Sequence, residues 1–168
     1  MASFRYITWP EYGRLTEALA KKVGSSKGNF ELVVGLARGG IPVSMVVSDR
    51  LGTMVDFINV KSYHGIAKRG PPRIVSDLTE PVKGKRVLVV DDLVDEGDTL
   101  AFVRGHLEGK GPRSLETAVI FKKPWSKTDP DYFIEATEDW IVFPFEVNEV
   151  NTLRSLGGAR SGSSKKGA

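Results

Sequence analysis

The stretch Val87-Leu88-Val89-Val90-Asp91-Asp92-Leu93-Val94-Asp95-Glu96-Gly97-Asp98-Thr99-Leu100 decides the fold of this 168-residue chain. It begins with an apolar, mostly β-branched run without polar alternation, which predicts a strand buried on both faces, as in the middle of a parallel sheet. An acidic turn with one glycine follows, and then a helical pattern that places Leu100, Val103 and Leu107 on one face. Strand, turn and helix in this order predict a ligand site at the carboxyl edge of an open α/β sheet.

The turn carries groups that suit a sugar phosphate. Backbone N–H groups of residues 95–99, with the first turn of the helix, offer a phosphate site, and Gly97 permits a positive φ. Asp91 and Asp92 only accept hydrogen bonds, so they suit sugar hydroxyls or a metal ion and would repel a bare phosphate. In one alternative, Asp98 or Thr99 merely caps the helix and the other acids face solvent. In another, a strand-end aspartate accepts a phosphoryl group.

The whole pattern resembles the phosphoribosyl-pyrophosphate (PRPP) motif of type I phosphoribosyltransferases, and the chain is closest to the members that act on 6-oxopurines. The resemblance covers roughly residues 4–150. It implies an α/β fold with a central parallel sheet, helices on both faces and a small hood formed by the N-terminus and the segment after Lys122. It assigns the ribose and 5′-phosphate of PRPP to Asp91, Asp92, Asp95, Glu96, Gly97, Asp98 and Thr99, and it makes Asp95 the catalytic residue that handles the proton at the purine N7.

A second glycine turn follows the apolar strand predicted at residues 31–36. It is the segment Ala37-Arg38-Gly39-Gly40, and an apolar helix comes next. A glycine pair between strand and helix binds anions well, and the Arg38 guanidinium suits phosphate. Alone, the segment could be a tight structural turn with a surface arginine, but PRPP requires two anion sites. The resemblance makes these four residues the pyrophosphate-binding loop and implies a cis peptide at Ala37–Arg38.

The segment Lys61 to Lys83 is rich in glycine, proline and charge. It follows a strand predicted at residues 55–60, and we expect it to be a long loop that is either functional or disordered. The resemblance implies a flexible loop, starting at Ser62 and Tyr63, that closes over the reacting centre and keeps water out. An idle exposed loop is the alternative. Near the N-terminus, Thr8 and Glu11 have capping-box spacing and predict the start of a helix.

The purine base is assigned to residues that follow the strand predicted at 115–121. In 6-oxopurine enzymes a strand-end lysine donates to the purine O6 and an aromatic ring stacks on the base, which implies Lys122, Lys123, Trp140 and Ile141. Strand alternation places Lys122 and Lys123 on opposite faces, so only one of them reaches the base. Lys123 fits bacterial xanthine–guanine enzymes better, and both are kept. The alternative is that the lysines are solvated and that the tryptophan belongs to the core.

The function implied is purine salvage, in which the phosphoribosyl group of PRPP moves to N9 of hypoxanthine, guanine or xanthine. Pyrophosphate beside so many acids requires a divalent cation, and oxygen ligands favour Mg²⁺; Asp91, Asp92 and Glu146 are the candidate ligands. Family members are commonly dimers or tetramers, so a homo-oligomer is expected. The alternatives are a PRPP- or nucleotide-sensing regulator of the same fold, and an enzyme for adenine, orotate or uracil.

Composition limits the partners and the location. The chain has no cysteine and no apolar run near the ~20 residues of a membrane span, which excludes disulfides and predicts a cytoplasmic protein that does not bind membranes. The net charge is +3, but residues 151–168 contribute +4, which leaves −1 for residues 1–150. Nucleic acid is therefore not an expected partner. We expect a phosphoribosyltransferase domain at 1–150 and a disordered, basic, Gly/Ser-rich tail at 151–168.

Overall fold

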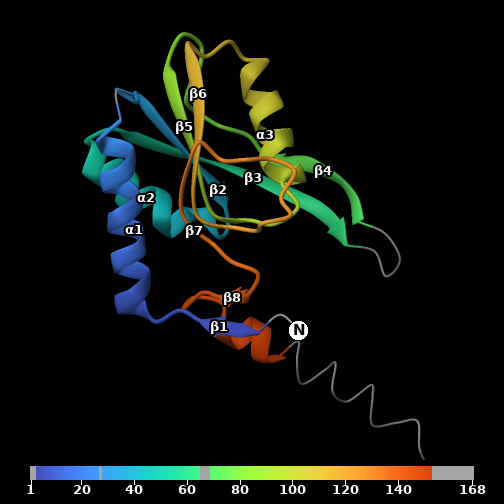
Figure 1. The fold of residues 1–168 in the computed structure, drawn as a ribbon. Coiled ribbons are helices and arrows are strands. Elements are labelled where there is room, and N and C mark those ends of the chain that lie inside the picture. Colours follow the sequence, from blue (N-terminus) through green and yellow to red (C-terminus); the bar gives the residue numbers. More distant parts are fainter. Residues whose placement is uncertain (1–2, 27, 65–68, 153–168) are drawn as a thin grey trace, which may run out of the picture. The chain divides into compact units, whose positions relative to one another are not determined.

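The computed structural model describes residues 3–26, 28–64 and 69–152 (Figure 1), and the chain forms two compact units. The larger unit is Leu15–Thr137, and the smaller combines residues 1–14 with residues 138–168. The elements of the described chain are β1 (Phe4–Tyr6), α1 (Trp9–Gly24), β2 (Leu32–Ala37), α2 (Gly40–Leu51), β3 (Met54–His64), β4 (Arg69–Ser76), β5 (Arg86–Val94), α3 (Asp98–Glu108), β6 (Ser114–Lys122), β7 (Tyr132–Ala136) and β8 (Trp140–Val142).

The larger unit is built on a six-stranded sheet in the order β4-β3-β2-β5-β6-β7. Every neighbouring pair is parallel except β3 and β4, which are antiparallel. From the β2–β5 pair, in which Gly35 lies opposite Val90, the chain proceeds outward through β3 on one side and through β6 on the other. The boundary between β2 and β5 is therefore the topological switch point, where open α/β sheets bind ligands.

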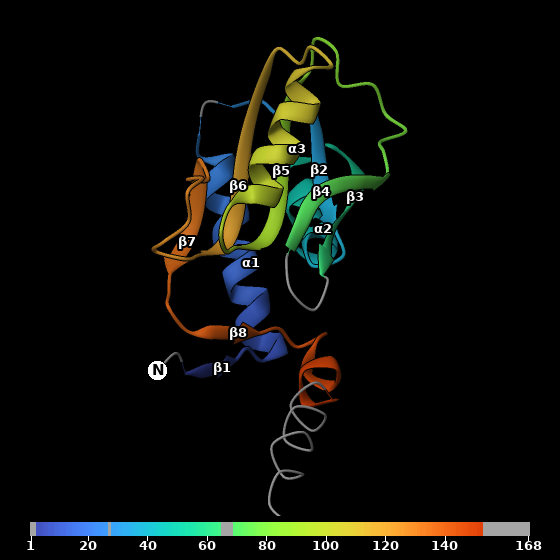
Figure 2. The same ribbon diagram turned by 90° about the vertical axis from the view of Figure 1, so that its right-hand side faces the viewer.

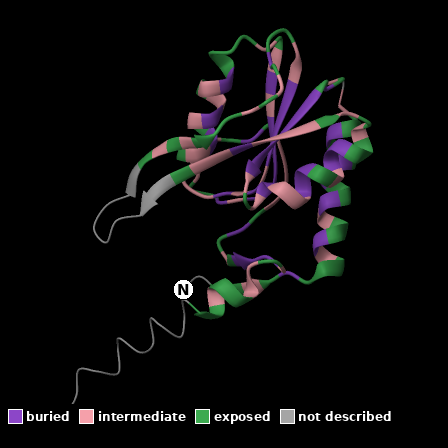
Figure 3. Ribbon diagram, turned by 180° about the vertical axis from the view of Figure 1, so that it is seen from behind, coloured by how far each residue is buried: buried purple, intermediate pink, exposed green. Residues whose placement is uncertain are grey.

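The two central strands are buried, as their unbroken apolar sequences predict (Figure 3). Leu32, Val33, Val34 and residues 87–90 are fully buried. Residues on one face of these strands share a core cluster with Leu100, Val103 and Leu107 of α3. On the other face Gly35 lies against Ser44 of α2, and α3 lies on the opposite side of the sheet from α1 and α2 (Figure 2). The predicted fold class, a mostly parallel sheet covered by helices on both faces, is confirmed.

The prediction of a long loop over residues 61–83 was wrong in its first half. β3 continues to His64 and pairs with β4, with Ser62 opposite Pro72, so a hairpin replaces most of the expected loop. Residues 65–68, at its tip, lie outside the described residues. Proline at residues 71–72 pointed to a loop, but β4 is the edge strand of the sheet, and an edge strand tolerates proline because its outer side lacks a ladder.

The extent of the hood was also predicted wrongly. Residues 123–137 belong to the larger unit, because β7 extends the main sheet by pairing with β6. Of the tail expected to be disordered, Asn151 and Thr152 are helical, and residues 153–168 lie outside the described residues.

The smaller unit joins two distant parts of the sequence. β1 pairs in parallel with β8, and Phe4, Arg5 and Tyr6 lie opposite Trp140, Ile141 and Val142. Tyr12 packs edge-on against the rings of Phe143 and Phe145. The Thr8 hydroxyl oxygen accepts a hydrogen bond from the backbone N–H of Glu11 at 3.3 Å, which agrees with the predicted cap. No helix in the described chain is both long and apolar enough to span a membrane.

Candidate functional site

Both predicted anion-binding turns lie at the switch point of the sheet. β2 ends at Ala37 and β5 at Val94, and their carboxyl ends share one edge because the strands are parallel neighbours. The two turns lead directly into α2 and α3, whose N-cap residues are Gly39 and Gly97. Neither helix has a side-chain hydrogen bond at its N-cap. The alternative in which Asp98 or Thr99 caps α3 is therefore wrong, and the first-turn N–H groups of both helices can serve an anion.

The glycine turn at residues 37–40 lies against the aspartate pair. A Cβ placed on Gly39 would come within 2.2 Å of Asp92 Oδ2, and one on Gly40 would come within 2.7 Å of the Val90 carbonyl oxygen and 3.1 Å of Asp91 Oδ1. Only glycine allows this approach, so the two segments found separately in the sequence form one site. Asp92 is 9% exposed and Asp91 is half-buried.

The aspartate pair lies within β5 and not at its end. β5 continues to Val94, which pairs with Lys122 of β6, so the two carboxylates extend from opposite faces of a strand that is still hydrogen-bonded. The backbone N–H of Asp92 donates to Asp91 Oδ1 at 2.9 Å. On the other side of the switch point the Ala37–Arg38 peptide is cis, as expected, and Arg38 is exposed.

The acidic turn is held by the loop between β6 and β7, residues 123–131. Gly97 has φ of +92°, and a Cβ there would come within 2.8 Å of Thr128 and 2.9 Å of Ser126 Oγ. Two backbone hydrogen bonds join the segments: Lys123 N–H donates to the Val94 carbonyl at 2.9 Å, and Lys127 N–H donates to the Glu96 carbonyl at 3.1 Å. Gly97 is thus required both for its conformation and for its packing.

A tryptophan connects the acidic turn to a buried lysine. Trp125 Nε1–H donates to Asp95 Oδ1 at 3.0 Å, and the Lys123 ammonium lies over the same indole ring, 5.5 Å from its centroid. Lys123 is only 6% exposed, whereas Trp125 is 49% exposed. Hence the Lys123 ammonium, the Trp125 ring and the Asp95 carboxylate lie next to one another in space, in this order, at the carboxyl edge of β5 and β6.

A family model described as the phosphoribosyl transferase domain matches residues 6–150. The chain belongs to this family. The xanthine-guanine phosphoribosyltransferase of Cereibacter sphaeroides is 36% identical over 149 residues, which cover 84% of this chain and 86% of that protein. The enzyme of the same name from Idiomarina loihiensis is 29% identical over 158 residues, 93% of this chain and 94% of that protein.

A solved structure gives the same result for this phosphoribosyltransferase. The purine phosphoribosyltransferase from Pyrococcus horikoshii superposes with a TM-score of 0.78 at 34% identity, over 85% of this chain and 93% of that chain. The family membership applies to both glycine turns and to the acidic stretch, because all of them fall within the matched residues.

The two candidate lysines of this phosphoribosyltransferase have different surroundings, as strand alternation predicts. Lys122 pairs with the Asp129 carboxylate and lies 5.1 Å from the centroid of the Phe133 ring. Lys123 is buried beside Trp125 at the edge that carries Asp95. Lys123 is therefore the better candidate for contact with a ligand.

Three further predicted residues, Trp140, Ile141 and Glu146, lie in the smaller unit. Trp140 is 58% exposed, with its ring 6.2 Å from that of Phe4, while Ile141 is buried in β8. Ser62 and Tyr63 belong to the backbone of β3, and their side chains lie outside the described part of the structure.

Sequence reasoning missed the role of the loop at residues 123–131. It gave Trp125 no part in the site, yet half of the surface of this residue is exposed and its indole N–H reaches Asp95. Ser126 and Thr128, which pack on Gly97, carry no periodic or motif signal. Their only indication in the sequence was their place directly after a strand that ends at the same sheet edge.

The residues present fit a metal ion that is bound mainly by substrate phosphates and only partly by the protein. Among the described residues no cluster of three or more His, Cys, Asp or Glu side chains could hold a metal on its own. Asp91 and Asp92 offer hard oxygen atoms beside the glycine turn. Mg²⁺ commonly binds through one or two carboxylates together with substrate phosphates, and this donor set matches that pattern.

Proposed function

We propose that this phosphoribosyltransferase transfers the phosphoribosyl group of PRPP to N9 of a 6-oxopurine, which yields a nucleoside monophosphate and pyrophosphate. The observation that carries the proposal is the contact of Gly39 and Gly40 with the Asp91–Asp92 pair at the switch point of the sheet. It is supported by relatives of more than 30% identity whose names specify purine, xanthine or guanine as substrates.

The two turns divide the substrate between them. Ala37, Arg38, Gly39 and Gly40 bind the pyrophosphate group, where the N-terminus of α2 and the Arg38 guanidinium offset its negative charge. The turn that leads into α3, residues 95–99, binds the 5′-phosphate with its backbone N–H groups. The carboxylates of Asp91 and Asp92 accept hydrogen bonds from the ribose hydroxyls and fix the sugar between the two anion sites.

The base binds beside Asp95 and Lys123. A 6-oxopurine presents an acceptor at O6, and a lysine ammonium only donates, so Lys123 and O6 form a matched pair. Asp95 accepts the proton at N7 while N9 forms the bond to C1′ and the bond from C1′ to the pyrophosphate oxygen breaks. Trp140, whose ring is exposed and suits a planar base, and Ile141 are the further base-binding residues that the family resemblance implies.

Mg²⁺ is the proposed cofactor. Asp91 and Asp92 are the residues that would hold it together with PRPP, where it would supply positive charge beside the pyrophosphate group; Glu146 is retained as a candidate for a second ion. We further propose that the protein acts in the cytoplasm as a homo-oligomer, in line with the family resemblance.

The test is a panel of bases assayed with PRPP and Mg²⁺. Adenine presents a donor amino group where a 6-oxopurine presents O6, so it would leave two donors facing each other at Lys123. We expect kcat/KM for the best of guanine, hypoxanthine and xanthine to exceed that for adenine and uracil by at least ~10-fold, the lower edge of the cost of such a mismatch. If adenine is the best substrate, the base site is assigned wrongly. No turnover of any base would favour a regulator that keeps the fold, and a mobility-shift assay with nucleic acid would examine that.

A further inference from the structure

We propose that Trp125 is a positioning and specificity-determining residue, which orients Asp95 and Lys123 at once through the edge and the face of one indole ring. This inference rests on the proposed function, since it is concerned with how the base is recognised. It assigns a role in the site to a side chain of the β6–β7 loop that does not itself need to contact the substrate.

The edge of the ring fixes Asp95. Trp125 Nε1–H is a donor only, and it meets Asp95 Oδ1 at 3.0 Å. With Oδ1 held in this way, rotation of the carboxylate about its Cβ–Cγ bond is restricted, and the second oxygen keeps one direction. A base that presents a proton at N7 then meets a carboxylate that is already oriented.

The face of the ring fixes Lys123. The ammonium lies 5.5 Å from the ring centroid, within the distance at which a cation is attracted to an aromatic face. Lys123 is almost fully buried, so its position is set by the groups packed around it, and the Trp125 ring is one of them. The ring therefore holds the donor proposed for O6 at a set place relative to the acceptor proposed for N7.

The position of Trp125 is itself maintained by the backbone. The loop that carries it is joined to the acidic turn by the hydrogen bonds of Lys123 N–H to Val94 and of Lys127 N–H to Glu96, and by the packing of Thr128 on Gly97. A tryptophan that is 49% exposed contributes little to a core, so burial alone does not account for its fixed orientation.

Two variants of Trp125 separate the hydrogen bond that the edge of the ring makes to Asp95 from the contact that its face makes with Lys123. Trp125→Phe keeps the ring over Lys123 and removes the donor to Asp95, whereas Trp125→Leu removes both. For Trp125→Phe we expect KM for guanine to rise ~10-fold, the effect of losing one hydrogen bond to a charged group, and KM for PRPP to change less than ~2-fold. For Trp125→Leu we expect, in addition, a ~3- to 10-fold fall in the ratio of kcat/KM for guanine to that for adenine.

A cycle with Asp95 identifies the route of the effect. The dissociation constant of guanine, which can carry the N7 proton that GMP lacks, is measured by calorimetry for wild type, Trp125→Phe, Asp95→Ala and the double variant. If Trp125 acts through Asp95, adding Trp125→Phe to Asp95→Ala changes the constant less than ~2-fold. Lys127→Ala, in the same loop, is the control and should behave as wild type, because its contact to Glu96 is made by the backbone.

The outcomes are distinct. Equal KM values for guanine in wild type and Trp125→Phe would overturn the inference and leave the proposed function standing. The inference would also be overturned if Trp125→Phe lowered the melting temperature and raised the KM values for guanine and PRPP to the same extent, because that result would indicate a structural role. A wild-type protein that neither turns over a purine nor binds guanine would overturn the proposed function and this inference with it.

Discussion

The amino and carboxyl edges of the central sheet, where its parallel strands begin and end, both carry acidic residues, but the acids at the two edges have different partners. At the amino edge, Asp56 at the start of β3 accepts N–H groups of Phe57, Thr79 and Glu80, each within 2.7–2.8 Å. At the carboxyl edge, Asp91 and Asp92 lie against the glycines of a turn, and Asp95 is bound by a tryptophan of another loop. Asp56 thus accepts hydrogen bonds from backbone N–H groups of β3 and of the segment after β4. Asp91 and Asp92 instead lie against Gly39 and Gly40, where there is no room for a side chain.

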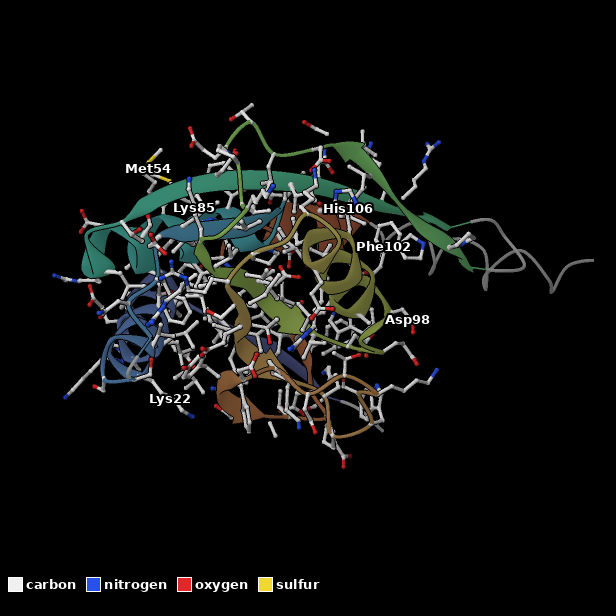
Figure 4. All side chains as sticks on the ribbon, turned by 90° about the horizontal axis from the view of Figure 1, so that it is seen from above. Lys22, Met54, Lys85, Asp98, Phe102 and His106 are labelled. Atoms are coloured by element: carbon white, nitrogen blue, oxygen red, sulfur yellow. The ribbon has the colours of Figure 1, made fainter. Side chains whose placement is uncertain are left out.

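Electrostatics at the amino edge agree with a structural role. Burial acts to raise the pKa of Asp56, but the backbone N–H donors of Glu80, Phe57 and Thr79 outweigh it, so the pKa lies below its ordinary value. Asp77, in the turn after β4, receives Lys110 Nζ at 2.7 Å and contacts His106 Nε2 at 2.9 Å. His106 lies on the side of α3 toward β3 and β4 (Figure 4). Acids of this kind stabilise the fold whether or not a ligand is present.

The largest expected effect is at the carboxyl edge. Asp91→Asn combined with Asp92→Asn preserves shape but places amide donors where sugar hydroxyls should donate. We expect kcat/KM for PRPP to fall on the order of 10³-fold with the melting temperature within a few degrees of wild type. Asp77→Asn, the same chemical change at the other edge, is the matched control and should retain activity. Near wild-type kinetics of the double variant would remove the pair from the site.

The next effect concerns the glycine that lies against the pair. In Gly39→Ala the new methyl would meet Asp92 Oδ2 at 2.2 Å, so the carboxylate must move while the backbone, with φ of −60°, accepts alanine. We expect KM for PRPP to rise about 10- to 100-fold, in the range that misplacing a substrate-positioning group costs. Gly105→Ala, in α3 with nothing within 4 Å of the new methyl, is the control: it should keep KM and raise stability by up to ~1 kcal/mol. Equal KM values in the two variants would contradict the proposal.

Asp56→Ala tests the amino edge by stability. The substitution leaves the N–H groups of Phe57, Thr79 and Glu80 without the carboxylate that accepts them, so we expect a loss of about 2 kcal/mol in the free energy of unfolding. Urea titration measures it, and activity per folded molecule should not change. Asp49→Ala, an exposed acid of α2, should change stability by less than ~0.5 kcal/mol. A loss of activity per folded molecule in Asp56→Ala would contradict the purely structural role of the amino edge.

The smallest effect is a pH dependence. Burial acts to raise the pKa of Asp77, but hydrogen bonds from Lys110, the Leu78 N–H and His106 outweigh it and lower the pKa to about 2, from an ordinary 3.8. The stabilisation is thus complete above pH ~4 and is lost as the pH falls toward ~2. Because the carboxylate is 37% exposed, solvent screening reduces it to about 1 kcal/mol.

The measurement compares the unfolding free energies of wild type and Asp77→Asn from pH 7 downward. The difference should hold from pH 7 to ~5 and fall to about half near pH ~3. If the difference in unfolding free energy grew as the pH fell, the pKa of Asp77 would not be lowered in the folded protein, and the stabilising role of its carboxylate would be contradicted.

The sequence predicted the parts of the molecule whose signal is local. The apolar runs of β2 and β5, the glycine turns at 39–40 and 97, and the cap at Thr8 each need only a few neighbouring residues, and the structure agrees with them. The contact of Trp125 with Asp95 joins residues 30 positions apart and has no periodicity that could reveal it. β4 was missed for a different reason: its prolines are compatible with a strand only at the edge of a sheet, and that position is a property of the whole topology.

The pairing of β1 with β8 has a consequence for the order of synthesis. Phe4–Tyr6 is made long before its partner strand, Trp140–Val142, so β1 stays without this partner on the ribosome until β8 has emerged. Residues 15–137 contain every strand of the main sheet, and none of these strands depends on the smaller unit for a partner. A ribosome-bound chain that has reached residue 137 but not Trp140 therefore has all the strands of the main sheet, while β1 still lacks its partner strand and is exposed to a chaperone or a protease.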